Sequence, residues 1–198
     1  MSVGEVKNGK IWAIIYTNLY WQKLILRNLR GKISKKYLPD SNFIHSAKHC
    51  AILRVTLREP KKAAKNRDYQ ISRQDFEVWE SRHGEIPDGA IVLVNTGSAQ
   101  LWPDKQRYIG TAERGEEAIP KLHFPGLAPD AARWLKENRN IKAFGLDTPS
   151  IDYGQSKDFM SHRILYEKNI IGMENVANLD KLPAKGFYAF AFPMKIKG

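Results

Sequence analysis

Residues 143–152 read Ala-Phe-Gly-Leu-Asp-Thr-Pro-Ser-Ile-Asp, which is an apolar run followed directly by a polar turn. A short continuous apolar run that ends in turn residues is typical of a strand buried on both faces. Residues 90–94 have the same character, and residues 187–192 form a third run of this kind. We therefore expect three buried strands, and we expect them to share one sheet.

Helical patterns lie between these strands. Ser72 is suited to cap a helix that extends to Arg82, and Pro129 suits the first turn of a second helix. A short third helix is expected over residues 161–168. Because strands and helices alternate along the chain, the sequence predicts an α/β fold with a sheet core.

The charge of the chain is unevenly distributed. The 198 residues carry a net charge of +11, with a sequence pI of about 9.7. Residues 1–70 hold 15 Lys/Arg and 4 Asp/Glu, whereas residues 71–198 hold 17 of each and are neutral. This contrast indicates two parts, a basic unassigned leader at residues 1–51 and a folded domain at residues 52–198.

The leader allows several interpretations. Apolar residues from 12 to 29 fall roughly at helical spacing with basic residues between them, which predicts an amphipathic helix, solvated or loosely docked. Contact of the basic residues with nucleic acid or an anionic membrane is the less favoured alternative, because no known nucleic-acid motif is present. We expect the leader to pack poorly against the rest. The single cysteine, Cys50, excludes an internal disulfide and makes the cytoplasm the default compartment.

Several blocks of the second part occur in a characteristic order. Residues 145–152 fit the pattern G-x-D-T-x-S-x-D. His162 is followed twelve residues later by Glu174, within a segment that fits H…E-N-L-x-N-L-D. Further blocks lie at residues 96–97, 123–126 and 193–196. Together these blocks resemble the C-terminal part of the cyclase family of metal-dependent hydrolases, which includes the kynurenine formamidases.

The resemblance carries expectations about fold and chemistry. It implies an incomplete cyclase-like domain of the swivelling β/α type, with a mixed sheet core and flanking helices. It also implies a divalent metal, zinc or manganese, held by His162 and Glu174, which activates water toward an amide carbonyl. The implied substrate is a small-molecule amide such as N-formylkynurenine of tryptophan catabolism, and the implied assembly is a homodimer.

One part of the family pattern is missing from this sequence. The family's first metal motif, H-x-G-T-H-x-D-x-P-x-H, does not occur, and His45-Ser46-Ala47-Lys48-His49 keeps only the spacing of its two leading histidines. The implied general base, the last histidine of that motif, has no counterpart. We therefore expect a truncated arylformamidase-like chain that is catalytically inactive. The alternatives are a non-catalytic remnant or pseudoenzyme that partners a family paralogue, and a basic binding module through residues 1–70.

The two implied ligands should lie together in space. Twelve residues are enough for a short helix that starts near His162 and for a turn that brings Glu174 back toward it. We expect both side chains to face a cavity bordered by residues 96–97 and 147–152. On the side where the missing motif would lie, we expect them to be exposed.

Overall fold

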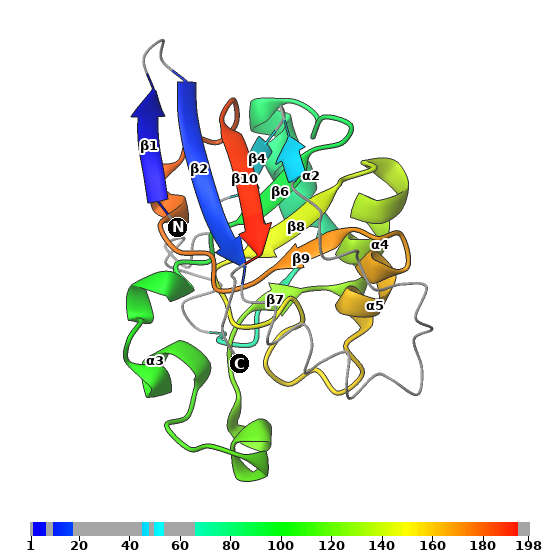
Figure 1. Ribbon diagram of the computed structural model, residues 1–198. Coiled ribbons are helices and arrows are strands. Elements are labelled where there is room, and N and C mark those ends of the chain that lie inside the picture. The colour runs from blue at the N-terminus through cyan, green and yellow to red at the C-terminus, as the bar shows by residue number, and fades with distance from the viewer. Residues whose placement is uncertain (1, 7–9, 18–44, 48–49, 54–65, 194–198) are drawn as a thin grey trace.

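The computed structural model describes residues 2–6, 10–17, 45–47, 50–53 and 66–193 (Figure 1). Its elements, in chain order, are β1 (Ser2–Val6), β2 (Lys10–Thr17), β3 (His45–Ala47), β4 (Cys50–Leu53), β5 (Gln70–Ile71), α2 (Arg73–His83), β6 (Ile91–Val94), η2 (Ser98–Leu101), α3 (Lys105–Ile109), η3 (Glu116–Lys121), β7 (Gly126–Leu127), α4 (Pro129–Asn138), β8 (Ala143–Leu146), α5 (Met160–Tyr166), β9 (Ile171–Met173), η4 (Leu179–Lys181) and β10 (Tyr188–Pro193).

A parallel sheet forms the centre of the domain. Its strand order is β4-β6-β8-β9, and each neighbouring pair is parallel. Every residue of β6 and of β8 is buried. The two apolar runs therefore form strands that are covered on both faces, and the α/β fold class is confirmed.

Helices cover one face of this sheet. Val92 and Val94 of β6, with Phe144 and Leu146 of β8, belong to a core that also contains apolar residues of α2, α4 and α5. The two-residue side-chain period of a strand sends alternate residues to this face. The helical residues of this core are Phe76, Trp79, Ala131, Ala132, Trp134, Leu135, Ile164 and Leu165.

A second sheet covers the other face. Ile91, Leu93 and Ala143 point away from the helices and form a second core with Phe187 and Ala189. The second sheet has the order β1-β2-β10-β3, in which β2 and β10 run parallel and the other pairs are antiparallel. Figure 1 shows β2 (blue) and β10 (red) side by side. The domain thus has three layers: helices, the parallel sheet and the mixed sheet.

The expectation of one common sheet is wrong for the third strand. β6 and β8 share a sheet as predicted, but β10 belongs to the mixed sheet. Phe187 and Ala189 pack onto the face of the parallel sheet instead of extending its edge. An apolar run indicates that a strand is buried but does not identify the strand that pairs with it. The sequence pattern therefore could not distinguish a place in the parallel sheet from a place in the mixed sheet.

The structure also corrects the prediction for the leader. Residues 12–17 lie in strand β2 and are not helical, so the helix prediction is wrong there, while residues 18–29 lie outside the described residues. The run of Ile, Trp and Tyr in this segment favours a strand. β2 and β3 hydrogen-bond to β10, and β4 spans the boundary at residue 51. These strands therefore join the sheets of the domain, and the poor packing of the leader stays a prediction.

The three helices occur where they were predicted. α2 begins after Ser72, where the Asp75 carboxylate accepts hydrogen bonds from the Ser72 N–H at 2.7 Å and from its hydroxyl at 2.9 Å. α4 has Pro129 in its first turn, and α5 starts one residue before the predicted segment. Within the described part of the chain, every helix is too short or too polar to cross a membrane.

Candidate functional site

The start of α5 is held by a carboxylate from the preceding loop. The first N–H groups of a helix have no partner within the helix, and Phe159 at the N-cap offers no side-chain acceptor. Asp152 provides one instead: its Oδ1 accepts from the Ser161 N–H at 2.9 Å and its Oδ2 from the His162 N–H at 3.2 Å. The loop after β8 therefore fixes where α5 begins.

The same carboxylate orients the imidazole of His162. The distance from His162 Nδ1 to Asp152 Oδ2 is 2.5 Å, and His162 Nε2 lies 3.0 Å from Glu174 Oε1. Glu174 Oε1 also accepts from the Ile151 N–H at 3.1 Å. One buried imidazole thus joins two carboxylates, one from the loop after β8 and one that follows β9.

This arrangement favours the imidazolium form of His162. Burial alone would lower the pKa of His162, but the hydrogen bonds and negative charges of Asp152 and Glu174 outweigh it and raise the pKa to about 9. Both ring nitrogens then donate, one to each carboxylate. A metal ligand needs a neutral imidazole, so an ion would have to displace the Nε2 proton.

The raised pKa predicts a pH-dependent stability. The folded-state pKa lies above the unfolded value, so the contribution is fully present below about pH 6.5 and is lost as the pH rises through about 9. We expect a loss of about 3 kcal/mol in the free energy of unfolding of the metal-free protein over this range. Urea titrations of the wild type and of His162→Gln, compared at each pH, measure it. The prediction is contradicted if the difference in the free energy of unfolding between the wild type and His162→Gln stays constant from about pH 6 to 9.5.

The predicted proximity of His162 and Glu174 is confirmed, whereas their predicted exposure is wrong. His162 is fully buried, and the Glu174 side chain is only 7% exposed. The rings of Phe159 and Tyr166 meet the imidazole edge to face, at centroid distances of 6.1 Å and 5.5 Å. The pair is therefore buried within the protein.

A second buried network lies beside this site. The Asp147 side chain accepts from the Thr96 N–H at 2.8 Å and from its hydroxyl at 2.7 Å. The phenol oxygen of Tyr108 lies 3.0 Å from the Asp147 carbonyl oxygen and 2.9 Å from Asn175 Oδ1. The sequence placed Thr96 and Asp147 near the site, but it gave no signal for Tyr108, which comes from the separate helix α3.

His162 and Glu174 are of residue types that hold divalent metals. A histidine whose Nδ1 is fixed by a carboxylate is a common ligand arrangement, and Glu174 adds an oxygen donor. Zinc sites usually use at least three protein ligands, and the described residues contain no group of three His, Cys, Asp or Glu able to hold a metal. His45 is described in its backbone only, within β3, and His49 lies outside the described residues. Within the part of the chain that the structure describes, the two donors therefore fit a metal in type and orientation but are fewer than the usual three.

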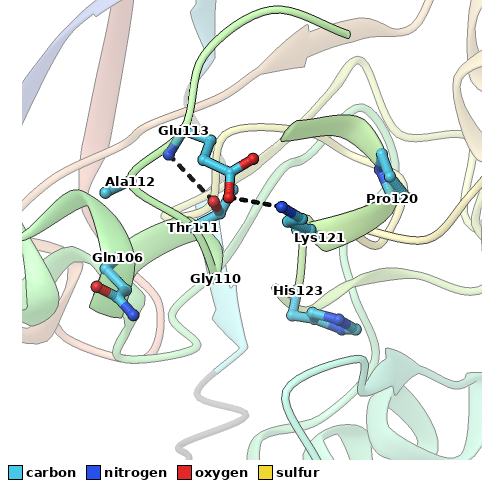
Figure 2. Close-up of a pocket in the computed structure, with 8 residues that line it drawn as sticks. All are labelled: Gln106, Gly110, Thr111, Ala112, Glu113, Pro120, Lys121 and His123. Carbon is cyan, nitrogen blue, oxygen red and sulfur yellow. Dashed lines mark hydrogen bonds and ion pairs between the residues drawn. The ribbon is translucent and has the colours of Figure 1, made fainter. Parts of the chain in front are cut away.

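A separate pocket lies between α3 and η3, as Figure 2 shows. It has a volume of about 410 Å³, and the ion pair of Lys121 and Glu113 (2.5 Å) spans part of it. Neither His162 nor Glu174 lines this pocket. Its lining residues are Gln106, Gly110, Thr111, Ala112, Glu113, Pro120, Lys121 and His123.

Known proteins are similar to this chain in sequence and in fold. The isatin hydrolase of Roseibium aggregatum is 33% identical over 141 residues, which are 69% of this chain and 51% of that protein. The kynurenine formamidase of Bordetella petrii is 34% identical over 73 residues, 37% of this chain and 34% of that protein. The structure of isatin hydrolase A from Labrenzia aggregata bound to benzyl benzoate superposes with a TM-score of 0.61 at 32% identity, over 81% of this chain and 58% of that one.

The match to a family model settles the classification. Residues 37–153, more than half of the chain, match the model of the cyclase family, "Putative cyclase". The match begins inside the segment that we assigned to the leader. The chain spans about half the length of the isatin hydrolase that it matches. With the relatives and the shared fold, this match shows that the chain belongs to the cyclase family.

Proposed function

We propose that this chain carries the His162–Glu174 half of a metal-dependent amide hydrolase centre. The observation that supports it best is the orientation of His162, whose Nδ1 is held by Asp152 while Nε2 faces the Glu174 carboxylate. When bound, a zinc or manganese ion would lower the pKa of a water molecule and polarise the substrate carbonyl. Asp152 keeps the ring in place, and Phe159 and Tyr166 limit the access of bulk water to it.

The proposed substrate is an amide attached to an aromatic ring. Two relatives are named for such compounds: isatin, a lactam fused to an aromatic ring, and a formamide of kynurenine. In both, hydrolysis adds water across a C–N bond next to an aryl group. We propose the same substrate class for the hydrolase centre to which His162 and Glu174 would contribute.

The number of donors limits what this chain does alone. An ion with two protein ligands is bound more weakly than one with the usual three. The family's general base also has no counterpart in this sequence. We therefore propose that the chain binds metal weakly and does not turn over substrate by itself. Activity would require further ligands from another chain, such as a family paralogue.

Metal titration tests this proposal. Calorimetry with Mn²⁺ and Zn²⁺ should show weak binding by the wild type that is lost in His162→Ala and in Glu174→Gln. His83→Ala, which removes a histidine of α2 remote from this pair in sequence, serves as the control and should bind as the wild type does. Equal binding by the wild type and His162→Ala would overturn the proposal. Assays with isatin and with N-formylkynurenine should show no turnover by the chain alone.

A further inference from the structure

Glu174 is held both through its carboxylate and through the backbone turn that follows it. Its carboxylate contacts the Ile151 N–H and His162, whereas its backbone continues directly into Asn175. Asn175 has a φ of 56°, in the left-handed region that few residues other than glycine and asparagine adopt. The chain therefore makes a defined turn immediately after the carboxylate that meets His162.

The turn at Asn175 is anchored at three points. Its N–H donates to the Thr148 carbonyl at 2.8 Å, and the next residue, Val176, donates to the Leu146 carbonyl at 3.0 Å. The side chain of Asn175 meets the Tyr108 phenol at 2.9 Å. Two of these anchors are backbone contacts to β8 and its loop. The third depends on one side chain from α3.

Tyr108 is well placed to act as a fixed support. It is 5% exposed, and its hydroxyl also contacts the Asp147 carbonyl oxygen at 3.0 Å, so the phenol joins the loop after β8 to the turn after β9. Burial, followed by the negative charges of Asp147 and Glu174, raises the pKa of Tyr108. The phenol therefore keeps its proton and remains a hydrogen-bond donor at neutral pH.

We propose that Tyr108 is a positioning residue that, through Asn175, holds the Glu174 carboxylate against His162. The proposal rests on the proposed function where it concerns metal binding by His162 and Glu174. The positioning of Glu174 is itself a property of the metal-free protein. Groups that orient metal ligands typically change metal affinity about 10- to 100-fold when they are removed. We expect Tyr108→Phe to weaken Mn²⁺ binding by about 10-fold, because Asn175 then loses its side-chain partner.

Two variants separate positioning from general stability. Tyr108→Phe removes only the hydroxyl. Asn175→Gly removes the amide while keeping a residue that accepts a positive φ. Tyr69→Phe is the matched control, since it removes a half-buried hydroxyl that hydrogen-bonds to Asp75 at the start of α2. If Tyr108→Phe does not fold, the test uses Asn175→Gly alone, with the same two measurements.

The readout is the ¹⁵N–¹H signal of the His162 imidazole in metal-free protein at constant pH, together with the Mn²⁺ affinity. Both variants should shift the His162 Nε2 signal and weaken Mn²⁺ binding, while Tyr69→Phe changes neither. Unchanged signals and unchanged affinity in both variants would overturn the proposal. If the wild type itself binds no Mn²⁺, the proposed function fails, and the imidazole signal alone decides whether Tyr108 positions Glu174.

Discussion

Replacing Gly126 with alanine is expected to lower the free energy of unfolding by about 3 kcal/mol or more, because overpacking against backbone cannot be relieved by a rotamer change. A Cβ at this position would overlap the backbone nitrogen of Tyr153 and the carbonyl carbon of Asp152. Gly126 lies in β7, directly against the loop that carries Asp152. Moving that loop would also move the carboxylate that fixes α5 and His162.

The matched control for this variant is Gly145→Ala in β8. There the added Cβ would meet side-chain atoms, Leu93 Cδ2 at 2.8 Å and Met173 Cβ at 3.1 Å, and the nearer of the two is the end of a side chain, not backbone. We expect a loss of about 1 to 3 kcal/mol at this site. Urea denaturation followed by tryptophan fluorescence measures both variants. A Gly126→Ala protein that unfolds within about 1 kcal/mol of the wild type would contradict the prediction.

Replacing Asp152 with alanine is expected to cost about 3 to 5 kcal/mol, the range found when one partner of a buried ion pair is removed. The change leaves the His162 Nδ1 and the N–H groups of Ser161 and His162 without their acceptor inside the protein. The loss in the free energy of unfolding should be largest at pH values below the pKa of His162, where the Asp152 carboxylate stabilises the imidazolium form. Guanidinium denaturation at pH values on either side of the pKa of His162, about 9, measures the effect.

Asp158→Ala provides the comparison for Asp152→Ala. Asp158 is an exposed carboxylate of the same loop, and its contact is a long hydrogen bond of 3.4 Å from the Ser156 hydroxyl. Substitutions at exposed positions of this kind usually change the free energy of unfolding by no more than about 0.5 kcal/mol. Similar losses in the two variants would show that Asp152 does not have the structural role described above.

The sequence predicts the local elements of this fold better than it predicts their arrangement. The buried strands at β6 and β8 follow from continuous apolar runs, and α2 and α4 follow from a cap residue and a first-turn proline. The placement of β10 depends on contacts between residues far apart in sequence, which periodicity does not encode. The same limit applies to β2: its Ile, Trp and Tyr residues favour a strand, but its pairing with β10 is visible only in the structure.

The sequence predicted that His162 and Glu174 lie together, but it did not predict the groups that surround them. His162 and Glu174 were identified because they stand in a block with a characteristic spacing, and they do meet. Asp152 lies in another such block, but its contact with His162 is visible only in three dimensions. The burial of the pair was missed because the missing motif suggested an open side. In the structure, neighbouring rings and the loop after β8 enclose it.

The pairing of β2 with β10 has a consequence for how the protein is made. Trp12 pairs with Tyr188, so the two strands are separated by almost the full described chain. At synthesis rates of about 5 to 20 residues per second, β2 leaves the ribosome roughly 9 to 35 seconds before its partner exists. During that interval, the edge of β2 that will later bond to β10 lacks this partner, and such an edge is a template for association with other chains. Nascent chains of this protein should therefore depend on chaperones until β10 is released.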